Sequence, residues 1–146
     1  MIKRFIFDLD GTLIDKVDFS ELVRRKLKEF NYQYTDTQFR QYMQAMQNYE
    51  KKFSKYTFDD YFEYIHQISM IDFSPEYMKS FLSSATKYVP DFVHQDVISA
   101  LNYLKEKYEL VVLTNFFKEV QMLRMENAGI PFIFDDVMGG THLLNQ

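Results

Sequence analysis

The sequence has 146 residues, 47% hydrophobic and 18% aromatic, which is enough apolar material for one core and a smaller appended unit. Its net charge of −4 and lack of a long basic run argue against nucleic acid as a partner. It has no cysteine, which excludes disulfides and a thiolate-ligated zinc site. With neither a signal peptide nor an apolar span of about 18 residues, we expect a cytoplasmic protein without a membrane partner.

The first predicted element is an apolar strand, Arg4–Phe7, which leads directly into the residues DLDGTL at positions 8–13. Alternate residues of an extended chain lie on the same side, so Asp8 and Asp10 can be directed at one point. Neighbouring carboxylates repel each other unless a cation is present, and carboxylate oxygens suit Mg²⁺. A carboxylate can also attack phosphorus to form an aspartyl phosphate.

A helical pattern without glycine follows over residues 16–89. Its apolar spacing predicts a first helix from Phe19 to Phe30 that stops at Asn31. Three further helix starts are marked by capping signals, namely Thr35 with Gln38, Thr57 with Asp60, and Ser74 before Pro75. We therefore expect a four-helix bundle, in which the many tyrosines and methionines pack the core or, in part, line a substrate cavity.

Helices and strands alternate after Pro90. The pattern predicts a helix with apolar residues from 93 to 104, a buried strand Glu109–Leu113, a helix containing Phe117–Leu123 that ends at Gly129, a strand Ile130–Phe134, and a loop at Gly139–Gly140. This order predicts an α/β fold, a Rossmann-like parallel sheet formed by residues 1–15 and 90–146. Residues 16–89 are then a helical cap inserted into it.

Polar residues follow two of the predicted strands, and ligands bind beyond the carboxyl ends of strands in such sheets. Thr114 and Asn115 end the second strand and can hold a phosphate oxygen, or else only cap the next helix. Near Asp8 and Asp10, Gly11 lets the backbone approach a ligand, and Thr12 can donate a hydroxyl hydrogen bond.

Two of these segments resemble a known family. Residues 5–13 resemble the first motif of the haloacid dehalogenase superfamily of phosphohydrolases, and residues 110–115 are similar to its second motif. Residues 129–137 resemble a later segment of many members, and the helical insert resembles the family's type-1 cap. The resemblance therefore implies a core of Rossmann-like topology with a cap that closes over the site, with hinges near Asp15–Val17 and Tyr88–Asp91.

The resemblance also implies roles for individual residues. Asp8 would be the nucleophile, Asp10 the general acid and base, and Thr114 a phosphate ligand. Asp8 and Asp10, the latter through its backbone carbonyl, would hold Mg²⁺. The dehalogenases generally lack an acid at position 10, so the resemblance favours phosphoryl transfer from a small phosphorylated metabolite over carbon–halogen hydrolysis. A phosphomutase is a close variant.

The sequence departs from the family at its end. The family has a third-motif lysine and a fourth-motif acidic cluster, and residues 139–146 contain no Lys, Asp or Glu. Lys118 either reaches the site or is a solvated helix residue. Asp135-Asp136 could be taken for the fourth motif, but its position so soon after the second motif argues against that. The three histidines, His66, His94 and His142, show no ligand spacing.

Two further expectations concern assembly and activity. Strand 4–7 would be an open sheet edge, so we expect either a fragment of a longer protein or a homo-oligomer that covers this edge. The first functional hypothesis is a Mg²⁺-dependent phosphatase-like hydrolase. The alternatives are a truncated, non-catalytic binding protein and a helical segment that serves protein interaction.

Overall fold

The computed structural model describes residues 1–14, 18–52, 57–87, 95–130 and 133–140. These residues form two compact units. One takes in the described residues of Met1–Val17 and Thr86–Gly139, and the other those of Asp18–Ala85. The two predicted hinges lie outside the described residues.

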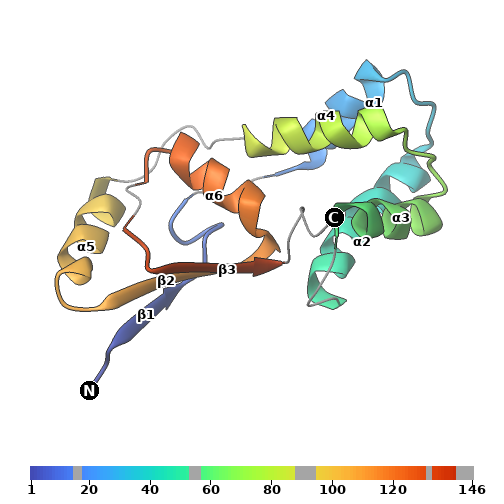
Figure 1. The fold of residues 1–146 in the computed structure, drawn as a ribbon. Helices are drawn as coiled ribbons and strands as arrows, with labels where there is room; N and C mark the ends of the chain where they lie inside the picture. Colours follow the sequence, from blue (N-terminus) through green and yellow to red (C-terminus); the bar gives the residue numbers. More distant parts are fainter. Residues whose placement is uncertain (15–17, 53–56, 88–94, 131–132, 141–146) are drawn as a thin grey trace. The chain divides into compact units, whose positions relative to one another are not determined.

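The first unit contains a three-stranded sheet in the order β1-β2-β3, formed by β1 (Arg4–Phe7), β2 (Glu109–Phe117) and β3 (Asp136–Gly140) (Figure 1). β1 and β2 are parallel, and Phe7 lies opposite Val112. Parallel neighbours need a long connection between them, which the helical insert and one further helix supply. The predicted α/β architecture with a parallel sheet is therefore confirmed. In the described part of the chain, β1 is an edge strand.

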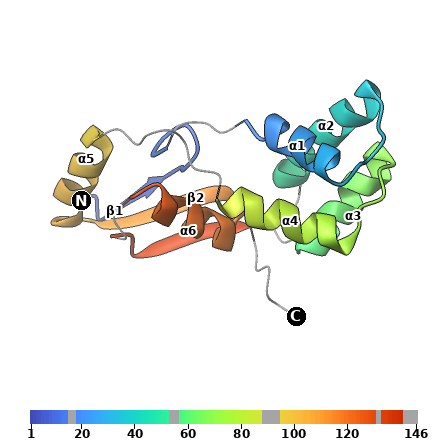
Figure 2. The same cartoon turned by 90° about the horizontal axis from the view of Figure 1, so that it is seen from above.

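An apolar core covers one face of this sheet. Leu101 of α5 (Gln95–Lys105) and Met125 of α6 (Lys118–Asn127) belong to the same buried cluster as Leu110 of β2. Figure 2 shows α6 lying across β2 and β3.

The opposite face of the sheet is only partly covered. Val111 of β2 lies on it and is buried, at 2% exposed. Side chains alternate along a strand, so Leu113 lies on the same face, and 49% of it is exposed. Ile6 of β1, which is paired with Val111, is 59% exposed. The prediction that β2 is buried on both faces therefore holds for Leu110–Val112 and is wrong at Leu113.

The second unit is a bundle of four helices, α1 (Ser20–Glu29), α2 (Asp36–Lys52), α3 (Phe58–Ser69) and α4 (Pro75–Thr86). Its core is rich in aromatic side chains, and the hydroxyls of Tyr42 and Tyr77 lie 3.1 Å apart in a hydrogen bond. Burial raises the pKa of both tyrosines well above the usual value. No helix in the described ranges combines the length and apolar character needed to cross a membrane.

The helix boundaries follow the predicted local signals. Thr35 and Gln38 cap α2 reciprocally, because each side chain accepts a hydrogen bond from the other's backbone N–H, at 2.9 and 3.1 Å. Thr57 accepts from the Asp60 N–H, and Ser74 accepts from the Tyr77 N–H. Asn31 follows α1 with a positive φ of 56°, which is the conformation of a helix stop.

The strand boundaries near the C-terminal end differ from the prediction. The third strand is Asp136–Gly140 rather than Ile130–Phe134, of which residues 131 and 132 lie outside the described residues. The two glycines predicted as a loop are part of this strand. A Cβ at Gly139 would lie 3.0 Å from the Phe116 carbonyl oxygen and 3.1 Å from Thr114 Cγ2. Glycine is therefore needed because β3 passes very close to the end of β2.

Candidate functional site

The candidate site begins with a tight turn after β1. Gly11 has a φ of +79°, which favours glycine, and its N–H donates to the Ile14 carbonyl at 2.7 Å. The Leu9 carbonyl accepts from the Leu13 and Ile14 amides at 3.0 and 3.1 Å. Leu9, Leu13 and Ile14 are all buried, so the turn is anchored in the core between the two acids and after them.

Asp8 is exposed at the start of this turn. Its Oδ1 accepts a hydrogen bond from the Leu9 N–H at 2.8 Å, which orients the side chain locally. The carboxylate is accessible to a ligand from solvent, as a nucleophile must be. Gly11 and Thr12 are exposed on the same turn.

Asp10 is held quite differently, by a buried arginine. Arg124 of α6 is 0% exposed, and its Nη2 and Nη1 donate to Asp10 Oδ1 and Oδ2 at 2.7 and 3.1 Å. Gln121 Nε2 also donates to Asp10 Oδ2, at 3.1 Å. Paired donors of a guanidinium match the two oxygens of a carboxylate, and such bonds are the strong ones in proteins.

Thr114 belongs to the same polar cluster. Its hydroxyl oxygen accepts from Gln121 Nε2 at 2.7 Å, and the Gln121 carbonyl oxygen accepts from Arg124 Nη1 at 2.6 Å. Gln121 therefore links the threonine of β2 to the acid of the β1 turn. The structure brings together Asp10 and Thr114 as expected from parallel strands, although Thr114 and Asn115 lie within β2, which continues to Phe117.

The other predicted site residues are less closely associated with this cluster. Asn115 is exposed in β2. Lys118, the first residue of α6, forms an ion pair with Asp136 at 3.7 Å. Asp135 accepts from Lys105 and from the Leu110 N–H, both at 2.8 Å, and the lysine bond holds the pKa of Asp135 below its usual range. Asp135 thus fixes the start of β2.

Sequence reasoning missed Gln121 and Arg124. The apolar residues of α6 indicated a core face through Leu123, which is in fact 45% exposed. The buried face consists of Val120, Gln121, Arg124 and Met125. The available signal was that Gln121 and Arg124 are three residues apart and therefore lie on one face of a helix, together with the apolar residues Val120 and Met125. The two hydrogen bonds to Asp10 give a reason for a charged side chain at this buried position.

The carboxylates of the site differ in their fit to Mg²⁺. Among the described residues no group of three His, Asp or Glu side chains converges on one point. Both oxygens of Asp10 face N–H donors, so this side chain is not directed at a metal. The exposed Asp8 carboxylate fits a hard cation, which commonly takes only one or two protein carboxylates.

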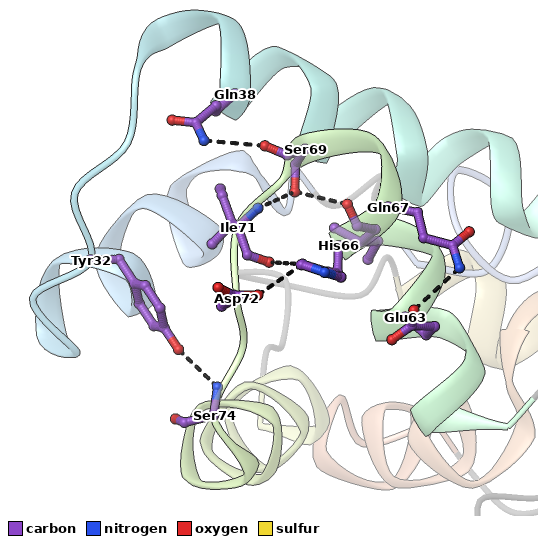
Figure 3. A network of polar contacts seen from close by, with 10 residues as sticks. Tyr32, Gln38, Glu63, His66, Gln67, Ser69, Ile71, Asp72 and Ser74 are labelled. Atoms are coloured by element: carbon purple, nitrogen blue, oxygen red, sulfur yellow. Dashed lines mark hydrogen bonds and ion pairs between the residues drawn. The ribbon is translucent and has the colours of Figure 1, made fainter.

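The helical unit contains a cavity of its own, of about 340 Å³. It is lined by the acids Asp59, Glu63 and Asp72, by Phe62 and Phe73, and by His66. Figure 3 shows His66 Nδ1 between the Ile71 carbonyl oxygen at 2.9 Å and Asp72 Oδ1 at 3.3 Å. His66 therefore fixes the loop between α3 and α4, whereas His94 and His142 lie outside the described residues.

Solved structures with the same fold are diverse in activity. YfnB of Bacillus subtilis, whose structure holds magnesium, has a TM-score of 0.69 at 18% identity, over 94% of this chain and 65% of that one. A protein of Thermotoga maritima assigned by inference as a beta-phosphoglucomutase has a TM-score of 0.58 at 20% sequence identity, over 99% of this chain and 64% of that one. L-2-haloacid dehalogenase of Xanthobacter autotrophicus, with chloropropionic acid covalently bound, has a TM-score of 0.58 at 15% sequence identity, over 95% of this chain and 57% of that one.

The chain therefore spans less than two thirds of the length of each of these proteins. No curated protein sequence matches it significantly. The family model for haloacid dehalogenase-like hydrolases matches residues 5–146, which is nearly the whole chain. Together with the parallel sheet and the acidic turn after its first strand, this match shows that the chain belongs to the haloacid dehalogenase-like hydrolase family.

Proposed function

We propose that this chain carries the nucleophile and the phosphate-binding threonine of a phosphohydrolase that acts on a small phosphate ester. The observation that supports this most directly is the exposed Asp8 carboxylate, two residues before an acid that is hydrogen-bonded through Gln121 to Thr114. An acid at position 10 favours phosphoryl transfer over carbon–halogen hydrolysis, because the resemblance associates dehalogenation with the absence of that acid. A phosphomutase would use the same groups with a sugar hydroxyl as acceptor.

The proposed reaction has two steps. Asp8 attacks phosphorus, a bond forms between its carboxylate oxygen and phosphorus, and the bond to the ester oxygen breaks. Asp10 gives its proton to the departing oxygen. It then takes a proton from the water that attacks the aspartyl phosphate, which releases inorganic phosphate and restores Asp8. Thr114 would hold a phosphoryl oxygen through its hydroxyl.

Mg²⁺ is the proposed cofactor. Asp8 and the backbone carbonyl of Asp10 would hold it, and it would neutralise negative charge on the phosphoryl group. The side-chain oxygens of Asp10 face Arg124 and Gln121 in this structure, so its contribution to the metal site would come from the main chain.

A non-catalytic binding role is the second candidate. It is supported by the engagement of both Asp10 oxygens with buried donors and by the absence of a three-residue acidic cluster among the described residues. A binding protein would retain affinity for a phosphorylated ligand without turnover.

Hydrolysis of an aryl phosphate in the presence of Mg²⁺ separates the two candidates. We expect Asp8→Asn to reduce turnover by about 10⁴-fold or more, because loss of a nucleophile removes the covalent route. Asp36→Asn makes the same chemical change at an acid in the first turn of α2 and should leave turnover unchanged. A folded chain without turnover, or an Asp8→Asn variant as active as the parent, would contradict the enzymatic proposal.

A further inference from the structure

The members of the cluster of Asp10, Thr114, Gln121 and Arg124 differ in their exposure to solvent and in the segment they come from. Three of its members come from β2 and α6, and these three are at most 5% exposed. The fourth, Asp10, comes from the turn after β1, and its side chain is 32% exposed. The three buried side chains therefore surround a carboxylate that reaches them from a different segment.

We infer that Thr114, Gln121 and Arg124 form a receptor for a tetrahedral oxyanion such as phosphate, and that the Asp10 carboxylate occupies this receptor as an internal ligand. The inference rests on the phosphate-binding role proposed for Thr114. It adds a cation and an amide to that role, and it makes Asp10 a competitor of the phosphoryl group.

The chemistry of the donors carries this inference. A guanidinium presents two parallel N–H groups that fit two oxygens of a carboxylate or of a phosphate equally well. Arg124 uses this pair on Asp10, at 2.7 and 3.1 Å. Gln121 Nε2 lies within hydrogen-bond distance of both Asp10 Oδ2 and Thr114 Oγ1, so one oxyanion at the Asp10 position would meet the same donors.

The exposures indicate which member moves. Arg124 and Gln121 are enclosed in the core of the first unit, whereas the Asp10 side chain is partly exposed to solvent. Removing the Asp10 carboxylate would open the receptor and leave the guanidinium without that anion. Loss of the carboxylate that pairs with a buried guanidinium is strongly unfavourable, so such a variant should take up an anion from solution.

Competition by an internal ligand has a measurable consequence. The apparent affinity for an external anion is reduced by the fraction of molecules in which the receptor is open. If Asp10 leaves the receptor open in about one molecule in ten, removal of its side chain tightens binding about ten-fold. Asp96 provides a matched control, since it is an acid of the same unit, lies in the first turn of α5, and takes no part in the proposed site.

The experiment is a calorimetric titration of the 146-residue chain with inorganic phosphate in the absence of metal. We expect Asp10→Ala to bind phosphate about ten-fold more tightly than the parent and Asp96→Ala to change the affinity by less than about three-fold. Equal tightening in both variants would show general charge repulsion and would overturn the inference. So would a parent chain and an Asp10→Ala variant of equal affinity.

A second pair of variants keeps the test decisive if Asp10→Ala folds poorly. Asp10→Asn preserves the size of the side chain, and it should also bind phosphate more tightly than the parent. Adding Gln121→Met to either Asp10 variant removes one donor without stranding a charge, and should reverse the gain. Persistence of the gain without Gln121 would contradict the assigned receptor. Because binding is measured without turnover, an inactive chain would refute the enzymatic proposal and leave this test intact.

Discussion

The stability of the buried pair between Asp10 and Arg124 can be predicted from its geometry. Asp10→Ala leaves the guanidinium of Arg124, which is 0% exposed, without its carboxylate. Removing one partner of a fully buried pair costs about 3–5 kcal/mol. Asp10 is 32% exposed, so water can reach part of the vacated space, and we expect a loss of about 2–4 kcal/mol in the free energy of unfolding.

The second substitution reverses the sign of the effect. Arg124→Met has a similar side-chain length and removes the charge that Asp10→Ala leaves without its carboxylate. In the Asp10→Ala background it should therefore raise the free energy of unfolding by about 1–3 kcal/mol, whereas in the parent it should lower it. This change of sign distinguishes a charge pair from ordinary packing, because loss of packing would lower stability in both backgrounds.

Urea unfolding followed by far-ultraviolet circular dichroism measures all four corners of this cycle. Arg4→Met is the matched control, since Arg4 forms an ion pair with Glu109 in which both side chains are largely in solvent. Its loss should have little effect, because exposed pairs contribute little. If Arg124→Met destabilises the Asp10→Ala variant as much as it destabilises the parent, the reasoning is refuted.

Two further predictions concern glycine geometry and tyrosine ionisation. Gly139→Ala should lower the free energy of unfolding by about 1–3 kcal/mol, because its Cβ would lie 3.0 Å from the Phe116 carbonyl oxygen. Gly129→Ala, which has open space but a φ of +75°, should cost about 1–2 kcal/mol from backbone strain alone; a urea midpoint equal to that of the parent, at an equal m-value, would contradict this for either variant. Burial, with a smaller effect of Asp60, raises the pKa of Tyr49 to about 12. The folded state then retains this proton while the unfolded state loses it near its usual value of about 10. Stability should consequently fall between pH 10 and about 12, and Tyr49→Phe should reduce that fall. A tyrosine absorbance titration identical in the parent and in Tyr49→Phe would show that Tyr49 ionises with the exposed tyrosines.

The helix boundaries could be predicted because each depends on neighbours in sequence. A capping box is satisfied within four residues, as Thr35 and Gln38 show, and Asn31 stops α1 through its own backbone conformation. Gly129 ends α6 in the same local way, with its N–H and that of Ile130 bonded to the carbonyls of Glu126 and Met125.

The strands and the buried face of α6 could not be read so directly. Gly139 reads as a loop residue until β3 is seen to pass within van der Waals contact of β2. Leu123 reads as core, and Arg124 as surface, because apolar residues are usually inside. Their actual placement depends on Asp10, which is 114 residues away in sequence and supplies the charge that makes a buried arginine tolerable.

The sequence by itself determined the family, the alternation of helices and strands, and the acidic turn with Asp8 and Asp10, because motif and capping signals are local. Tertiary structure alone decided what surrounds Asp10. Parallel pairing of β1 and β2 brings that acid to the end of β2, and α6 packs its Gln121 and Arg124 against the same point. No local sequence pattern predicts this contact, because its energy comes from the interaction of charged side chains that lie far apart in the sequence.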